Sequence, residues 1–179
     1  CRLAANASTV LQQLRESGPG LLVPLAWLFV AAADLGVVGS RSIFIAHLVM
    51  AAFIAFFLTT GWTDMSTGAL AGWRAVMVVG LGITLAGVAG FFVESTALLA
   101  TSLVGWMILP ATGLVYTGRL LDEAAGVYYG SAALGGLGAA IYLLSLVGYG
   151  GSIGVLGLGG LAFVGVGQTV GIVDAVVRF

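Results

Sequence analysis

Six apolar runs, each about as long as a membrane-spanning helix, dominate the sequence. They lie at residues 20–38, 43–62, 75–93, 97–117, 128–148 and 152–173. A helix that crosses the hydrocarbon core of a bilayer needs about 20 mostly apolar residues. The runs are apolar on nearly every side, which is typical of helices that face lipid instead of water. Continuous runs of this length also disfavour the alternating strands of a membrane β-barrel.

The charge content of the chain excludes a soluble domain. Only 7% of the 179 residues are charged and 60% are hydrophobic, whereas soluble domains carry about 25% charged residues. The formal net charge of −1 offers no basic surface to a nucleic acid. We therefore expect an all-α polytopic integral membrane protein, a bundle of about six transmembrane helices in a lipid bilayer, with no nucleic-acid partner.

The expected organisation has two parts. Residues 1–19 form an N-terminal juxtamembrane segment, either a short helix or a tail, which ends at the helix-breaking sequence Gly18-Pro19-Gly20. Residues 20–179 form the six-span transmembrane domain. The chain opens on Cys1, which we interpret as a processed or trimmed N-terminus.

The basic residues predict the orientation of the chain. With six spans, one side of the membrane holds both termini and the loops after the second and fourth spans. That side carries Arg2, Arg15, Arg74, Arg119 and Arg178, and the other side carries Arg41 alone. Because basic residues are enriched in cytoplasmic loops, we expect a multi-pass protein of the cell membrane with both termini in the cytoplasm.

The available residue types restrict the chemistry. The chain has no lysine, so it cannot form a Schiff base with a cofactor. His47 is the only histidine and Cys1 the only cysteine. One chain therefore cannot supply the ligands of a structural zinc site, an iron–sulfur cluster or a haem held by two histidines. We expect no cofactor and no metal.

One short motif is typical of a hydrolase. Gly150-Gly151-Ser152-Ile153-Gly154 fits the pattern G-x-S-x-G, which places a nucleophilic serine on a turn between a strand and a helix. Here the motif lies between two apolar spans, so we interpret Ser152 as the N-cap of the sixth span. We expect no catalytic residues, and a role other than catalysis is favoured over intramembrane serine hydrolysis.

Small residues recur at intervals of four in three of the spans. Lipid removes the hydrophobic drive between helices, so close packing depends on small residues that let backbones approach. We expect the third, fifth and sixth spans to pack on one another through such faces. The faces consist of Gly82, Ala86 and Gly90, of Ser131, Gly135 and Ala139, and of Gly167, Gly171 and Ala175.

Two further residues inside the spans predict local features. Pro110 lacks a backbone N–H, so it should kink the fourth span and free the carbonyl of Trp106. Gln168 and Thr169 lie deep in the sixth span, where we expect an interhelical hydrogen bond. Pro24 and Pro110 lie at different depths of their spans, which argues against an inverted repeat of three helices.

Ionisable groups near one membrane boundary form the candidate site. Asp34 lies near the end of the first span and His47 near the start of the second, and a tight hairpin joins the two spans. Arg41 lies in that hairpin, and Glu94 ends the third span on the same side. Ionisable groups inside a membrane are costly and by default indicate function. Asp34, Arg41, His47 and Glu94 are therefore candidates for binding a proton or ligand, with a purely structural clamp as the alternative.

Two classes of function are compatible with this pattern. The first is a transporter or channel for a proton, an ion or a small solute, with the Asp34 and His47 cluster at its outer mouth. The second is a non-catalytic membrane subunit or accessory protein packed within a larger complex. Its partner would be a second copy of the chain or another membrane protein. The first class requires a polar path that continues inward from His47, and the second requires exposed faces of small residues.

Overall fold

The computed structural model describes residues 18, 20–148 and 154–178 of the chain. Within these residues every regular element is a helix, as the apolar runs predict. The long helices are the first helix (Gly20–Asp34), α2 (Ser40–Gly61), α3 (Gly68–Phe92), α4 (Thr96–Leu120), α5 (Ala125–Gly148) and α6 (Val155–Arg178). Two short 3-10 turns, η1 (Asp64–Ser66) and η2 (Asp122–Ala124), connect α2 to α3 and α4 to α5.

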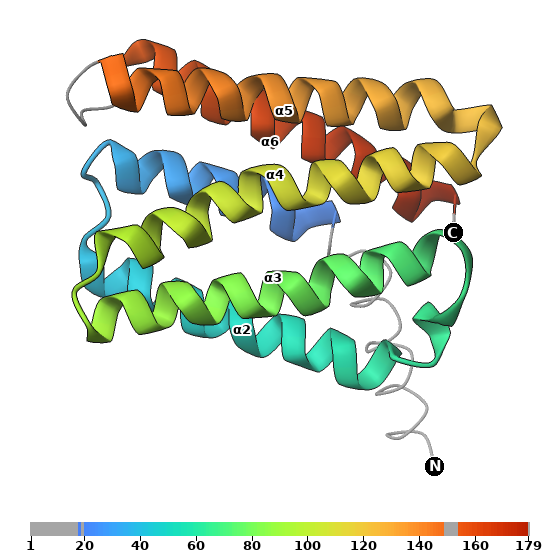
Figure 1. Cartoon of the computed structure of the whole chain (residues 1–179), viewed down its shortest axis with the longest axis horizontal. Coiled ribbons are helices and arrows are strands. Elements are labelled where there is room, and N and C mark those ends of the chain that lie inside the picture. Colours follow the sequence, from blue (N-terminus) through green and yellow to red (C-terminus); the bar gives the residue numbers. More distant parts are fainter. Residues whose placement is uncertain (1–17, 19, 149–153, 179) are drawn as a thin grey trace, which may run out of the picture.

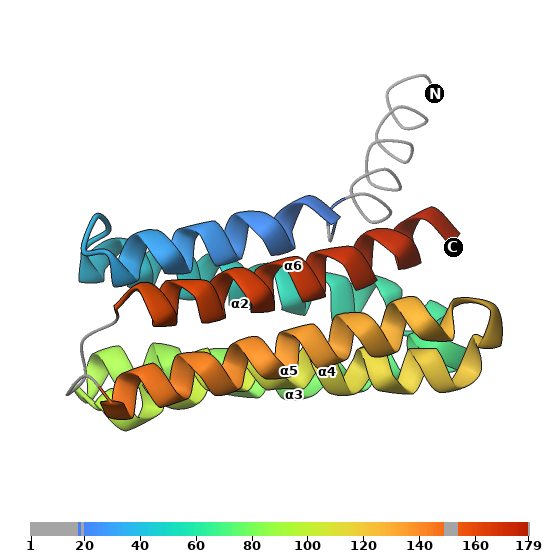
Figure 2. The same ribbon diagram turned by 90° about the horizontal axis from the view of Figure 1, so that it is seen from above.

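The six helices form a bundle of two layers. Figure 1 shows α5, α4 and α3 next to one another in the front layer, and the contacts between these neighbours agree. Figure 2 shows the second layer, which contains the first helix, α6 and α2. Successive helices run in opposite directions (Figure 1). We call the two ends of the bundle the Asp34 end, where the first helix stops, and the Arg178 end, where α6 stops.

The helices have the length and composition of membrane spans. All five helices from α2 to α6 are long and apolar enough to cross a bilayer, whereas the described first helix is shorter. Large apolar side chains on the outside support the same environment, because Leu28, Phe92 and Leu144 are each about two-thirds exposed or more. The chain is thus a multi-pass membrane protein, a bundle of six helices.

The first helix ends earlier than the expected residue 38. Gly36 has a φ of 72°, and the Val37 N–H donates to the Ala32 carbonyl at 2.9 Å while the Gly36 N–H donates to the Ala33 carbonyl at 3.0 Å. These two bonds form a Schellman motif, which needs a left-handed residue that glycine adopts without strain. The apolar run continues past Gly36, but the backbone has already turned.

The segment 63–74, between the apolar runs 43–62 and 75–93, was expected to be a loop, but most of it is helical. Only residues 62–67 lie outside the α-helices, and α3 begins at Gly68, so Arg74 lies inside the helix. An arginine does not end a helix, because its apolar stem can lie along the helix while its guanidinium reaches polar surroundings. At the other terminus α6 continues past residue 173 to Arg178, whose Nε contacts the Asp174 carboxylate at 2.6 Å.

Helices α3 and α4 carry the same sequence pattern and pack through it. The pattern G-W-x6-G-L-x2-T occurs at residues 72–84 and again at 105–117. The Trp73 indole donates to the Thr117 hydroxyl at 3.1 Å, and the Trp106 indole donates to the Thr84 hydroxyl at 2.9 Å. Each threonine in turn donates to the carbonyl four residues earlier in its own helix. The antiparallel pair is therefore locally two-fold symmetric.

Helices α5 and α6 approach each other through glycine. A Cβ atom added at Gly167 would lie 2.6 Å from the Ser131 carbonyl oxygen and 2.8 Å from the Gly135 nitrogen. A Cβ atom at Gly138 would lie 2.5 Å from the Gly160 carbonyl oxygen. These distances join backbone to backbone, so no side-chain movement could relieve the overlap. Ser131, Gly135 and Gly167, which the small-residue faces single out, thus lie at the contact between α5 and α6.

The small-residue face of α3 does not join this contact. Helix α3 packs against α2 and α4 instead of α5 and α6. Gly82 is exposed with no atom within 4 Å of its Cβ position, and Gly90 lies against Leu98 and Leu99 of α4. The expected packing of all three spans on one another is therefore wrong for α3, whose buried side is set by the pattern that it shares with α4.

The glycine contact between α5 and α6 leads to a prediction about stability. Gly167→Ala should lower the free energy of unfolding by about 1–3 kcal/mol, because the new methyl group overlaps the α5 backbone. Gly82→Ala is the matched control and should be neutral or stabilising by up to about 1 kcal/mol, since alanine favours a helix and meets no atoms. Equal midpoints of both variants in detergent unfolding would contradict the role of Gly167.

Candidate functional site

Asp34 contacts α5 at the Asp34 end of the bundle. Its half-buried carboxylate accepts a hydrogen bond from the Tyr142 hydroxyl at 3.1 Å. Tyr142 is only 2% exposed and belongs to a core cluster with Trp27 and Leu161. The hydrogen bond thus connects the last residue of the first helix to a buried side chain of the opposite layer.

His47 belongs to α2, and its ring contacts α3 and α4. Its Nδ1 is 2.9 Å from the Ile43 carbonyl oxygen, so this nitrogen carries a proton and donates it. In the neutral ring Nε2 then accepts from the Ser102 hydroxyl, which lies 3.4 Å away. The ring meets Phe91 edge-on, and a Cβ atom at Gly87 would lie only 2.7 Å from Nε2. Gly87 therefore makes the space in α3 that the imidazole occupies.

The four candidate residues lie at the same end but do not form one cluster. Among the described residues, no hydrogen bond or ion pair joins any two of Asp34, Arg41, His47 and Glu94. Arg41 and Glu94 are exposed. The described part of the chain also contains no group of three histidine, cysteine or acidic side chains that could hold a metal ion. The structure thus presents two separate sites, one at Asp34 and one at His47.

Glu94 has an unusual backbone conformation. Its φ is 52°, and the Ser95 N–H donates to the Gly90 carbonyl at 2.9 Å, which closes α3 as Gly36 closes the first helix. Few residues other than glycine adopt this left-handed region, because Cβ then approaches the following carbonyl oxygen. Glu94 therefore defines the turn between α3 and α4, and its carboxylate projects from a strained position.

Gln168 forms the most extensive set of polar contacts in the core. It is 3% exposed, and its Nε2 donates to the Trp106 carbonyl at 3.0 Å and to the Met107 carbonyl at 3.3 Å. Its Oε1 accepts from the Trp27 indole at 2.9 Å. The expected interhelical hydrogen bond of Gln168 is confirmed, and one of its acceptors is the carbonyl that Pro110 was expected to free.

Together with the separate contacts of Asp34 and His47, these residues make up a set that we call the polar belt. The Trp106 indole extends the Gln168 contacts to Thr84 of α3, and Ser102 lies one turn before Trp106 on α4. All six helices contribute to the set. The polar belt consists of Trp27, Asp34, His47, Thr84, Ser102, Trp106, Tyr142 and Gln168. Asp34 and His47 are its only members with a carboxyl or an imidazole group.

Sequence reasoning missed the partners of both ionisable groups. Tyr142 and Ser102 lie in apolar spans far along the chain from Asp34 and His47. A serine or tyrosine inside a span is common, so neither residue type was a specific signal. The S-x3-G-x3-A face of α5 and the repeated pattern of α3 and α4 carry the information, because they fix which side of each helix is buried.

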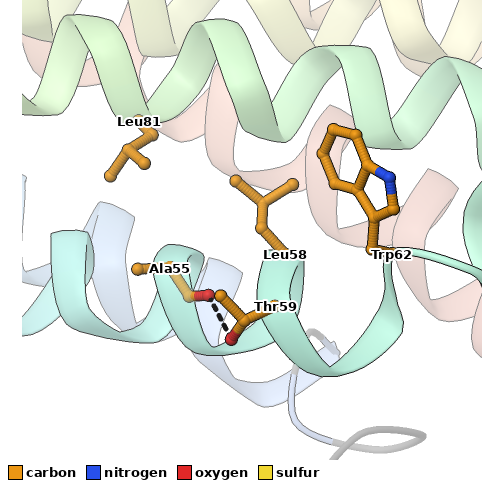
Figure 3. A pocket seen from close by; sticks show the side chains of 5 residues that line it. All are labelled: Ala55, Leu58, Thr59, Trp62 and Leu81. Carbon is orange, nitrogen blue, oxygen red and sulfur yellow. Dashed lines mark hydrogen bonds between the residues drawn. The ribbon is translucent and has the colours of Figure 1, made fainter.

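Two hollows open on the outside of the bundle. One, of about 440 Å³, lies between α2 and α3 and is lined by Ala55, Leu58, Thr59, Trp62 and Leu81 (Figure 3). The other, of about 250 Å³, lies between α5 and α6 and is lined by Gly126, Val127, Gly130, Ser131, Leu134, Gly167 and Val170. Neither hollow includes a member of the polar belt.

A buried hydroxyl group stands out near the second hollow. Within the described residues, the Ser131 hydroxyl is buried and has no hydrogen-bond partner. Ser131 also lines the hollow between α5 and α6. Unpaired polar groups in an apolar surrounding cost about 1–3 kcal/mol each, so a partner for Ser131 would be stabilising.

The remaining motifs cannot be placed. The N-terminal segment 1–17, including Cys1, and Ser152 of the G-x-S-x-G pattern lie outside the described residues. Comparisons with protein-family models, curated proteins and solved structures found no match to the chain.

The contacts of Gln168 predict a coupling with Pro110. Gln168→Leu should destabilise the bundle by about 2–4 kcal/mol, because the Trp106 carbonyl and the Trp27 indole lose their partners inside a membrane. In a Pro110→Ala background residue 110 regains a backbone N–H, which can pair with the Trp106 carbonyl. The same Gln168→Leu change should then cost roughly 1–2 kcal/mol less. Detergent unfolding of the four proteins measures the coupling, and strict additivity would contradict it.

Proposed function

We propose that the protein is a non-catalytic membrane subunit, a rigid bundle that packs sideways against a partner helix within a larger complex. The exposed small-residue face of α5 carries this proposal. Because most of the described arginines lie toward the Arg178 end, we also propose that the protein lies in the cell membrane with this end toward the cytoplasm.

The outer face of α5 has the composition of a helix contact. Its small residues are spaced along one exposed side of the helix. They are Gly126, Gly130, Ala133, Gly136 and Ala140. The three glycines have no atom within 4 Å of their Cβ positions. In lipid, small residues promote close approach of another helix and give an isolated helix no advantage.

A buried hydroxyl lies beside this face. The Ser131 side chain, 4% exposed, lines the hollow that Gly126 and Gly130 border, and its oxygen lacks a partner within the described residues. Because the oxygen itself is buried, a polar side chain on an incoming helix reaches it only after the Ser131 side chain rotates toward the hollow. Interhelical hydrogen bonds of this kind contribute about 0.6–2 kcal/mol in membranes.

The interior supports a scaffold role. Met107, Leu114, Tyr128 and Val164 have no exposed surface, and the helix contacts around them involve backbone atoms or large side chains. The members of the polar belt are hydrogen-bonded to one another or to backbone carbonyls. A satisfied polar network of this kind rigidifies a core.

The α5 face can be tested without disturbing the fold. Gly130→Leu should release the protein from its assembly in membranes solubilised in mild detergent, because the larger side chain holds the partner helix away. Native gel electrophoresis measures the size. Gly82→Leu, at an equally open glycine of α3, is the control and should leave the assembly intact.

The outcome of that experiment is decisive for the α5 face. A second copy of the chain and a different subunit are distinguished by mass spectrometry of the intact assembly. If the wild-type protein already migrates as a monomer, or if Gly130→Leu and Gly82→Leu behave alike, the α5 face is not an interface and the proposal is wrong.

Proton-linked transport is a second candidate, favoured by the half-buried Asp34 and His47. Ionisable groups inside a membrane are commonly part of proton pathways, and both residues hydrogen-bond to neutral hydroxyl groups. On this candidate, Asp34→Asn and His47→Ala should each lower proton flux into liposomes by about tenfold or more, the range of one general acid or base. A dye inside the liposomes reports the pH, and Arg41→Gln is the control. Flux equal to that of empty liposomes would exclude this candidate.

A further inference from the structure

The hollow between α2 and α3 is an apolar groove that opens on the outside of the bundle. Leu58 forms its buried floor, and the exposed Trp62 stands at the end where α2 stops (Figure 3). Its volume of about 440 Å³ is in the range of ligand sites in proteins. Apart from the Trp62 indole at the rim, the only polar side chain in the lining is Thr59, whose hydroxyl donates to the Ala55 carbonyl at 2.8 Å. Nothing inside the groove therefore needs a polar ligand.

A cationic group lies at the Trp62 end of the groove. The guanidinium carbon of Arg74 is 4.8 Å from the centre of the Trp62 ring, and Nη1 donates to the Trp62 carbonyl at 3.3 Å. These contacts hold the arginine at the rim and leave most of its N–H donors available.

The Trp62 indole adds a second donor at the same rim. Its nitrogen lies on the side of the ring turned away from Leu58 (Figure 3), and no hydrogen bond of this nitrogen occurs with the described residues. Tryptophan is enriched where the hydrocarbon core meets the headgroups, because its ring is apolar and its N–H is polar. The apolar groove thus begins at a pair of donors suited to a headgroup.

We propose that this groove binds one anionic glycerophospholipid. One acyl chain occupies the space along Ala55, Leu58 and Leu81, and the headgroup phosphate accepts hydrogen bonds from Arg74 and from the Trp62 indole. Arginine matches phosphate oxygens with paired N–H groups, and such charge-assisted bonds are stronger than neutral ones. Phosphatidylcholine carries the same phosphate, but Arg74 repels its choline cation, so the rim favours a headgroup with a net negative charge, while the groove accepts any fluid chain.

The lining distinguishes this groove from the α5 face. Leu58, Trp62 and Leu81 are large, so they hold a straight helix away from the α2 and α3 backbones. A flexible acyl chain can fill a space of this shape without close backbone approach. The charge at the rim provides the second argument for a lipid, because a phosphate complements Arg74.

The proposal is tested by titrating the purified full chain in neutral detergent with dioleoyl phosphatidylglycerol or dioleoyl phosphatidylcholine. Native mass spectrometry counts the retained lipids. We expect one phosphatidylglycerol to bind about tenfold more tightly than phosphatidylcholine, as expected for one charge-assisted contact. Arg74→Gln should abolish this preference. Arg119→Gln, at an exposed arginine of α4 outside the groove, is the control and should retain it.

A second variant keeps the test valid if Arg74→Gln fails to fold. Ala55→Phe fills the groove from α2 and leaves the rim intact, so it should reduce binding of both lipids. Equal retention of the two lipids by the wild-type protein, or an unchanged preference in Arg74→Gln, would overturn the proposal.

Discussion

The hydrogen bonds of Gln168 determine how the first helix, α4 and α6 fit together. Pro110 cannot donate to the Trp106 carbonyl, and an unpaired carbonyl in hydrocarbon costs several kcal/mol. Gln168 donates to that carbonyl from α6, and its own oxygen accepts from Trp27 of the first helix. The described part of the first helix is shorter than the other five helices and ends at a tight turn. The contact between Trp27 and Gln168 joins this helix to α6 and, through the Trp106 carbonyl, to α4.

Sequence reasoning predicted the contacts that depend only on the residue types and positions within a single helix. Pro110 frees a carbonyl wherever α4 packs, and a buried Gln168 needs partners in any arrangement, so both features followed from residue type and depth. The pairing of Asp34 with His47 depended on the rotation of two helices about their axes, which a short hairpin does not fix. Gly87 provides the space that turns His47 toward α3 and α4, and Tyr142 turns Asp34 toward α5.

The repeated pattern of α3 and α4 was available in the sequence. Residues 72–84 and 105–117 share glycine, tryptophan and threonine at matching positions. The sequence analysis considered an inverted repeat of three helices, whereas the symmetry in the structure relates two adjacent helices. Because they are antiparallel, the tryptophan of each helix reaches the threonine of the other. This symmetry fixes the buried side of α3, and it explains why Gly82 faces outward although its spacing is typical of a packing face.

The two outer hollows differ in a way that follows from their side chains. Between α5 and α6 the border includes Gly126, Gly130 and Gly167, which leave room for another backbone to approach. Between α2 and α3 the border is leucine and tryptophan, which keep a helix out but admit a flexible chain, and a cation lies at the rim. In a bilayer, where apolar area alone gives no preference between lipid and protein, side-chain size and single polar groups decide the occupant. The same physics that packs the interior through glycine thus underlies both proposals, a helix on the α5 face and a lipid in the α2–α3 groove.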